Sequence, residues 1–190
     1  MKKMLICMVL AAVAFCATSA WASTSTTVTV NAVVPVKSGG LTVDINKVTG
    51  DVWTTASSIN FGTLTWDNTN KIFTAASYYA VDIGVLDNTG TVWTVTHTRK
   101  SLASGTNNLD SKVNVSFNKQ VTKTSSTVLK KVSFANSNSV AYTKTQLSGG
   151  WLRIYYGIGT GSGDATGVTP IGLDTLAGTY TGSVTITLTP

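Results

Sequence analysis

The sequence predicts an all-β protein, and three observations lead to that prediction. Threonine, valine and glycine are abundant while every acidic residue is aspartate, a composition typical of sheets rather than helices. Short runs of alternating apolar and polar residues recur along the chain, separated by turn-forming residues. No stretch repeats its apolar residues at the 3.6-residue period of a helix. The number and spacing of the runs favour an immunoglobulin-like, Greek-key β-sandwich.

The first 22 residues have the pattern of a secretory signal peptide. Lys2 and Lys3 precede an apolar run, and small residues end in Ala20-Trp21-Ala22, which is typical of a cleavage site. The apolar run is too short to span a bilayer comfortably. We therefore predict a signal peptide (1–22), an N-terminal arm (23–36) and one sandwich domain (37–190). The protein is expected to be exported through the periplasm to the cell surface, with no membrane span after signal removal.

Cysteine and charge restrict the function classes. Cys7 and Cys16 both lie in the predicted signal peptide, so the exported chain would have no disulfide and would depend on burial for its stability. The net charge is +6, and removal of Lys2 and Lys3 leaves +4, scattered along the chain. Nucleic-acid binding needs a clustered basic face, so it is not expected.

The predicted arm contains the segment Thr27–Val36, which reads as a strand with one apolar face. The apolar positions are Val28, Val30, Ala32, Val34 and Val36, and the alternate positions begin with Thr27, Thr29 and Asn31. Because side chains alternate between the faces of a strand, this segment is expected to bury one face in a hydrophobic groove. The groove could belong to its own domain or to a neighbouring copy.

The middle of the chain contains further predicted strands. They are Leu41–Ile45, Ile59–Trp66, Tyr78–Leu86, Thr91–Thr98, Val113–Phe117, Val128–Phe134, Ala141–Leu147 and Trp151–Ile158. Asp87-Asn88-Thr89-Gly90 has the residues of a tight turn, which predicts a hairpin between Tyr78–Leu86 and Thr91–Thr98. Lys130 and Lys131 indicate an exposed sheet edge, since edge lysines discourage unwanted strand pairing.

The last predicted strand, Thr179–Thr189, has the clearest alternation in the sequence. Tyr180, Gly182, Val184, Ile186 and Leu188 share one face, while threonine and serine occupy the other. This strand is the best complement for the N-terminal arm.

No set of catalytic or metal-binding residues is recognisable, so we predict neither an enzyme nor a cofactor. His97 is the only histidine and is expected to be a hydrogen-bonded strand residue on the face of Trp93 and Val95. The aspartates are expected in turns or on the surface, with Asp82 as the exception within a strand. The glycine-rich segment around Gly159–Asp164 is interpreted as a flexible loop, with a weak calcium site at Asp164 as the alternative.

Four tryptophans remain after the predicted signal peptide. Trp93 and Trp151 lie mid-strand and are expected in the core. Trp53 and Trp66 lie near turns, and exposed rings there would stack on sugars. This favours an alternative function, a monomeric secreted or surface β-sandwich that binds glycans or acts as a coat or matrix protein.

The two ends of the chain resemble one family. Val28–Val36 is similar to the N-terminal donor arm of colonisation-factor-type subunits of alternate chaperone–usher fimbriae, and Ala177–Leu188 resembles their C-terminal strand. The resemblance implies an incomplete immunoglobulin-like sandwich, filled first by a periplasmic chaperone and then by the arm of the next subunit. Carried over, the donor residues would be Val28, Val30, Ala32 and Val34. The acceptor groove would be lined by Tyr180, Val184, Ile186 and Leu188.

The sequence therefore predicts a structural subunit of a bacterial surface filament (a fimbria or pilus) that polymerises by donor-strand exchange. Its expected partners are other copies of itself, a periplasmic chaperone and an outer-membrane usher. Whether the N-terminal strand pairs within one chain or between two chains is left open.

Overall fold

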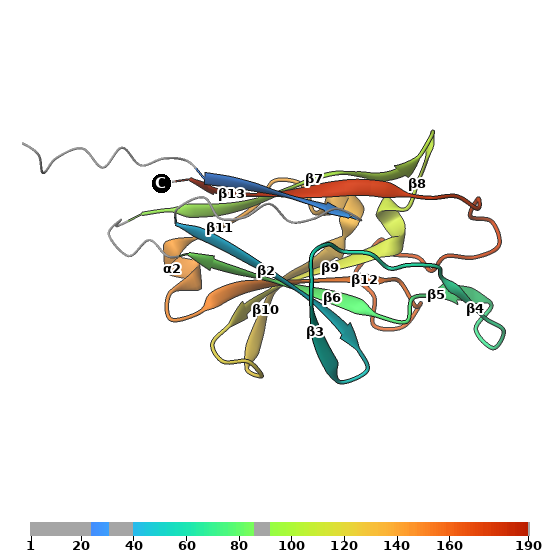
Figure 1. Ribbon diagram of the computed structural model, residues 1–190, viewed down its shortest axis with the longest axis horizontal. Helices are drawn as coiled ribbons and strands as arrows, with labels where there is room; N and C mark the ends of the chain where they lie inside the picture. The colour runs from blue at the N-terminus through green and yellow to red at the C-terminus, as the bar shows by residue number, and fades with distance from the viewer. Residues whose placement is uncertain (1–23, 31–39, 86–91, 190) are drawn as a thin grey trace, which may run out of the picture.

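The computed structural model describes residues 24–30, 40–85 and 92–189, and within them two antiparallel sheets pack face to face (Figure 1). The first sheet has the order β1 (Thr24–Val30), β13 (Thr181–Thr189), β7 (Thr94–Ser104), β11 (Val140–Thr143), with β8 (Asn107–Asn108) beside β7. The second has the order β10 (Ser126–Ser133), β9 (Val113–Gln120), β12 (Trp151–Ile158), β6 (Tyr78–Val85), β2 (Leu41–Thr49), β3 (Val52–Ala56).

The remaining elements are short. A hairpin of β4 (Thr65–Asp67) and β5 (Ile72–Thr74) lies beside the sandwich, and η1 (Asp110–Lys112), η2 (Phe134–Asn136) and α2 (Lys144–Leu147) form single turns of helix. The all-β prediction is confirmed, whereas the Greek-key, immunoglobulin-like assignment stays a prediction. The predicted signal peptide (1–22) lies outside the described residues.

The core lies between the two sheets and follows the alternation of the strands. The apolar faces predicted for β12 and β13 are buried: Leu152, Ile154, Tyr156 and Ile158 in β12, and Val184, Ile186 and Leu188 in β13. Arg153, on the opposite face of β12, is buried as well. Phe117 and Phe134 are the largest side chains in the fully buried set. Each buried side chain of this size stabilises the fold by about 1.5–3 kcal/mol relative to exposure.

His97 connects the two sheets through hydrogen bonds. Its Nε2 lies 2.9 Å from the hydroxyl of Tyr156 in β12, and its Nδ1 lies 2.8 Å from the carbonyl oxygen of Ser137. Because a carbonyl only accepts, Nδ1 carries the proton and Nε2 accepts from Tyr156. The ring of Phe117 packs edge-on at 5.1 Å. The expectation of a hydrogen-bonded strand histidine is confirmed.

Three predictions about strands were wrong. The predicted strand Ala141–Leu147 continues only to Thr143, because Lys144–Leu147 forms the helical turn α2, where the Gln146 side chain accepts from the Thr143 N–H at 2.9 Å. The hairpin predicted for Tyr78–Leu86 and Thr91–Thr98 does not form, because β6 and β7 belong to different sheets and both edges of β6 are occupied, by β12 and β2. The predicted turn 87–90 lies outside the described residues. In Ile59–Trp66, the side chain of Asn60 accepts from the Gly62 N–H at 2.9 Å, and Gly62 has a φ of 67°. This turn ends the strand that alternation had predicted.

The predicted exposed edge is confirmed at β10. This strand is the outermost member of the second sheet, and both Lys130 and Lys131 are exposed. Lysines at this position disfavour pairing of the edge with another chain. The other edge of the second sheet is β3, and the first sheet has β1 and β11 at its edges.

Burial of His97 predicts a pH-dependent stability. Burial lowers the pKa of His97 from 6.5 to about 4, since charging the imidazole between the sheets is unfavourable. The unfolded chain binds a proton below about pH 6.5, whereas the folded chain does so only near pH 4. Stability should thus be full above pH 6.5, fall by about 3 kcal/mol as the pH decreases to 4, and change no further through this group. Urea denaturation between pH 7 and pH 4 measures this dependence.

The control is His97→Gln, which lacks the titrating ring. It should be less stable at pH 7 but should lose this component of the acid dependence. An equal decline in both proteins between pH 6.5 and 4 would show that His97 does not control it.

Candidate functional site

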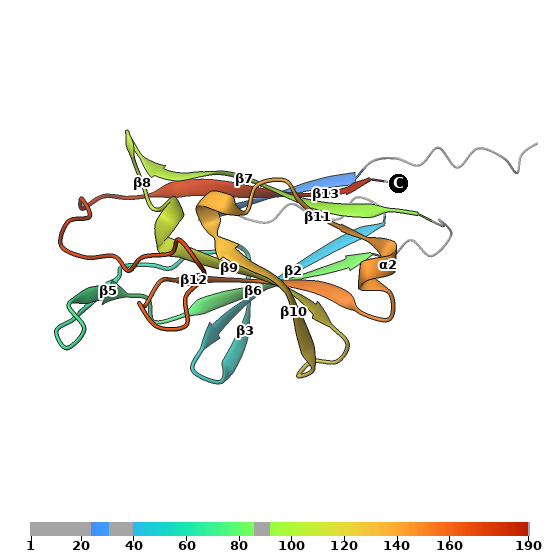
Figure 2. The same ribbon diagram turned by 180° about the vertical axis from the view of Figure 1, so that it is seen from behind.

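The edge of the first sheet is formed by β1, which lies beside β13 in both views (Figures 1 and 2). Within the described residues β1 has one partner strand, and the pairing is antiparallel over its whole length. Val28 lies opposite Val184 and Val30 opposite Gly182. Directly opposite positions share one face of a sheet. Two predicted donor positions are therefore in register with the predicted acceptor strand, while Ala32 and Val34 lie outside the described residues.

The predicted acceptor residues occupy two different environments. Val184, Ile186 and Leu188 are 1%, 0% and 5% exposed and form one apolar row facing the second sheet. Tyr180 precedes β13, is partly buried, and donates its hydroxyl to the carbonyl oxygen of Leu176 at 2.6 Å. Three of the four residues therefore belong to the core, and Tyr180 lies where the strand begins.

Gly182 marks an irregularity between β13 and β7. Thr181 pairs with Ala103 but Ser183 pairs with Lys100, so β7 has one extra residue at this point. A Cβ added to Gly182 would lie 2.8–2.9 Å from backbone atoms of residues 100–102. The position accepts only glycine because the backbones approach too closely for any side chain.

An apolar pocket of about 600 Å³ opens near Gly182, beyond the point where the β1 pairing ends. Its walls come from both sheets, the 60–64 loop and the 175–180 segment. The lining includes Phe61, Phe73, Leu109, Ile158, Ile171 and Tyr180. The row of buried apolar side chains in β13 is therefore followed by this pocket, which a further apolar side chain would fill.

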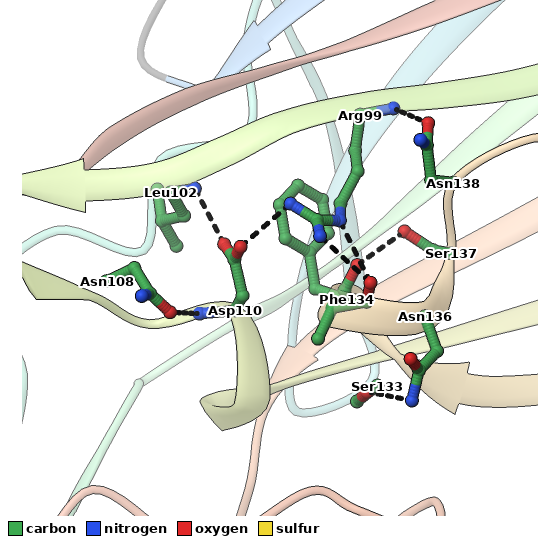
Figure 3. Close-up of polar contacts among 10 residues, drawn as sticks. Arg99, Leu102, Asn108, Asp110, Ser133, Phe134, Asn136, Ser137 and Asn138 are labelled. Atoms are coloured by element: carbon green, nitrogen blue, oxygen red, sulfur yellow. Dashed lines mark hydrogen bonds and ion pairs between the residues drawn. The ribbon is translucent and has the colours of Figure 1, made fainter.

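A partly buried ionic network, drawn in Figure 3, positions two residues that line this pocket. One carboxylate oxygen of Asp110 accepts from the Leu102 N–H at 2.8 Å, and the other binds Arg99 Nη1 at 2.7 Å. The Arg99 guanidinium also donates to the carbonyl oxygen of Ala135 at 2.9 and 3.2 Å. The bulged part of β7 is thereby attached to η1 and η2. This places Leu102 and Leu109, which both line the pocket.

Asp110 lies in the turn η1, which agrees with the expectation of a turn residue, but it does not lie on the surface. Its side chain is 11% exposed, and its oxygens satisfy a backbone donor that the bulge removes from the sheet ladder. The ion pair joins residues on separate elements, so strand alternation contains no signal for it. The turn itself has a local sequence signal in Asn108, whose side chain accepts from the Asp110 N–H.

The tryptophans expected at the surface do not form one site. Trp53 in β3 is 43% exposed, whereas Trp66 in β4 is partly buried and packs on Phe73 with ring centres 5.0 Å apart. Trp93 is buried, as predicted. The prediction of a core position for Trp151 was wrong, because it lies on the outer face of the second sheet and donates its indole N–H to Asp82 at 3.1 Å.

Asp164 organises the glycine-rich loop. Its carboxylate accepts from the backbone N–H groups of Thr160 and Gly161 at 2.9 and 2.7 Å, and from the Asn114 side chain at 2.7 Å. Lys131 also donates to the carbonyl oxygen of Gly163. Among residues 24–30, 40–85 and 92–189, no group of three His, Cys, Asp or Glu side chains is placed to hold a metal ion.

The sequence matches no protein-family model, and neither a curated protein nor a solved structure is significantly similar to it. In the part of the chain that the structure describes, no helix is long and apolar enough to cross a membrane. Inference about function therefore rests on the β1–β13 edge, the pocket and the exposed aromatic residues.

The close approach at Gly182 predicts a specific sensitivity to substitution. Gly182→Ala should destabilise the fold by about 1–3 kcal/mol, because the new methyl group would overlap the backbone of β7. Gly157→Ala in β12 is the matched control, since an added Cβ there meets its nearest neighbour at an ordinary 3.7 Å. Urea denaturation of both variants tests the difference, and equal losses would refute the assigned role of Gly182.

The network around Asp110 predicts a second sensitivity. Asp110→Ala leaves the Arg99 guanidinium and the Leu102 N–H without their partner, so stability should fall by about 2–4 kcal/mol. Asp44→Ala, which removes an exposed carboxylate from β2, should cost less than about 0.5 kcal/mol. Thermal and urea denaturation would contradict this role for Asp110 if the two variants were equally stable.

Proposed function

We propose that this protein is a structural subunit of a bacterial surface filament, in which the N-terminal arm of one copy completes the first sheet of the next. The observation that carries the proposal is the position of β1. It lies towards the N-terminal end of the chain, at a sheet edge, and pairs with the strand that the sequence identifies as its complement. The same backbone hydrogen bonds can form with the β13 of another copy, because donor and acceptor segments are identical in every copy.

The register supports a donor segment longer than β1. Since Val28 lies opposite Val184, continued antiparallel pairing would bring Ala32 to the level of Tyr180 and Val34 to the level of Gly178. Tyr180 and Gly178 both line the apolar pocket. In the proposed filament, Val28 and Val30 therefore occupy the register positions beside Val184 and Gly182, and continued pairing would bring Ala32 and Val34 to the level of the pocket.

Apolar burial at such a junction would offset much of the free-energy cost of association. Burial of four or five small apolar side chains contributes on the order of 6–12 kcal/mol before the cost of association and ordering. A contact in which each copy donates at one end and accepts at the other does not close, so it generates a fibre. We propose export through the periplasm, with a chaperone covering the β13 edge and an outer-membrane usher catalysing assembly at the surface.

The alternative is a monomeric secreted or surface sandwich in which β1 stays on the β13 of its own chain. The backbone contacts of the two arrangements are the same, so the oligomeric product distinguishes them. Filaments of the mature chain support the proposal, and a monomer at all concentrations supports the alternative.

Deletion of residues 23–36 tests the donor arm. The shortened chain should form no filaments by negative-stain electron microscopy and should melt at a lower temperature, because the edge of β13 loses its partner strand. A synthetic peptide of residues 24–36 should restore the melting temperature without restoring filaments. The matched control peptide carries Val28→Asp and Val30→Asp and should not stabilise. Filaments formed by the shortened chain would disprove the proposal.

A further inference from the structure

The outer face of the second sheet, which is turned away from the first sheet, bears a cluster of aromatic side chains around one arginine. The hairpins β2–β3 and β9–β10 both project on this side of the molecule (Figure 2). The cluster, called here the aromatic face, consists of Trp53 in β3, Tyr78 in β6, and Trp151, Arg153 and Tyr155 in β12. It shares no residue with the β1–β13 edge or the pocket.

Arg153 lies at the centre of the aromatic face and is held by hydrogen bonds. Its Nε and Nη2 donate to the two carboxylate oxygens of Asp82 at 2.6 and 2.8 Å, and its Nη1 lies 3.3 Å from the carbonyl oxygen of Lys123. The residue is 5% exposed. Because Asp82 neutralises the guanidinium and its donors are occupied, Arg153 is not free to bind an anionic ligand.

The indole ring of Trp53, called here the platform, packs on the guanidinium of Arg153. The guanidinium carbon of Arg153 is 4.9 Å from the centre of the indole ring, which is a cation–π contact. With one ring face on the guanidinium and 43% of the residue exposed, the indole presents its other face to solvent. Val48 in β2 is fully buried between Trp53 and Tyr78, at the register position opposite both. A platform held in this way loses little freedom when a ligand binds.

Tyr78 lies on the same face of the sheet as Trp53, since both are opposite Val48 in register. Tyr78 is 40% exposed, and its ring is 6.1 Å from that of Tyr155. Burial raises the pKa of Tyr78, and the nearby Tyr155 and Asp51 act in the same direction, so the phenol keeps its proton at neutral pH. The aromatic face therefore combines a flat apolar surface with a hydrogen-bond donor and acceptor at its rim.

The size and charge of the aromatic face favour a sugar over a protein. Two aromatic side chains about two-fifths exposed leave on the order of 200 Å² of surface, whereas a stable protein interface buries about 800 Å² on each partner. A hexopyranose ring matches the smaller area, since its C–H groups form an apolar face and its hydroxyls form a polar rim. The neutralised Arg153–Asp82 pair favours a sugar without charge.

We propose that the aromatic face is a binding site for a neutral polysaccharide, in which a sugar ring stacks on Trp53 and hydrogen-bonds to the hydroxyl of Tyr78. This function is independent of filament assembly, because the two sites lie on different sheets. A subunit in a filament would present the aromatic face at each repeat, and many weak contacts would add to a strong attachment.

Affinity electrophoresis of the mature chain tests the site. The gels contain one neutral polysaccharide (hydroxyethylcellulose, galactomannan or soluble starch) or one anionic polysaccharide (heparin or alginate). At least one neutral polysaccharide should retard the protein, and Trp53→Ala should weaken that retardation at least tenfold. The matched control Trp66→Ala, which removes a tryptophan packed on Phe73, should be retarded like the unmodified chain.

Tyr78→Phe is a second test, which leaves the Trp53 ring in place. It retains the ring and should weaken binding several-fold through loss of the hydroxyl, with an unchanged urea midpoint. The proposal is overturned if no neutral polysaccharide retards the protein, if only the anionic gels do so, or if a folded Trp53→Ala variant is retarded as strongly as the unmodified chain. Retardation that depends on Trp66 instead of Trp53 would also overturn it.

Discussion

The structure depends on the requirement that the edge of β13 be covered. This strand supplies the buried row of Val184, Ile186 and Leu188 to the core, and one of its edges is paired with β7 along most of its length. Its other edge carries backbone donors and acceptors that must be satisfied by a further strand or by water. Within the described residues β1 is the strand that satisfies them. A strand towards the end of the chain therefore completes a central part of the fold.

Several interactions contact β13 and its neighbour β7 without involving β1. Gly182 allows the backbones of β13 and β7 to meet at the bulge, and the Asp110 carboxylate binds the Leu102 N–H there. His97 then connects β7 to Tyr156 in the opposite sheet. These interactions position β13 independently of β1, as the proposed acceptor edge would require. The aromatic face on the second sheet is equally independent, because Asp82 and Arg153 support it from within that sheet.

Strand alternation predicted the faces of the strands well and their neighbours poorly. It identified the core residues of β12 and β13, and the lysines of β10 indicated the sheet edge. It could not show that β6 and β7 separate into two sheets, because a period of two residues specifies which face is buried and not which strand lies alongside. Trp151 was predicted to lie in the core, although the alternation of β12 places it on the same outer face as Arg153. The alternation alone therefore predicts its position correctly.

The polar interactions were the least predictable part. Asp82 and Arg153 are 71 residues apart, and Arg99 reaches Ala135 across 36 residues. These contacts arise only after the strands have been ordered in space. For the same reason the exposure of Trp53 could be predicted from its position near a turn, but its support by Arg153 could not. The pocket beyond Gly182 likewise combines the 60–64 loop with the 175–180 segment and has no sequence signature.

In the proposed filament the first strand of one copy pairs with β13 of another, and a disulfide placed at that pairing distinguishes this arrangement from pairing within one chain. Thr29 and Ser183 lie opposite each other, and a Thr29→Cys/Ser183→Cys double variant produced without residues 1–22 would contain no other cysteine. Pairing between copies predicts a ladder of disulfide-linked multimers on a non-reducing denaturing gel, which collapses to one band on reduction. A single, internally cross-linked monomer at every protein concentration would contradict it.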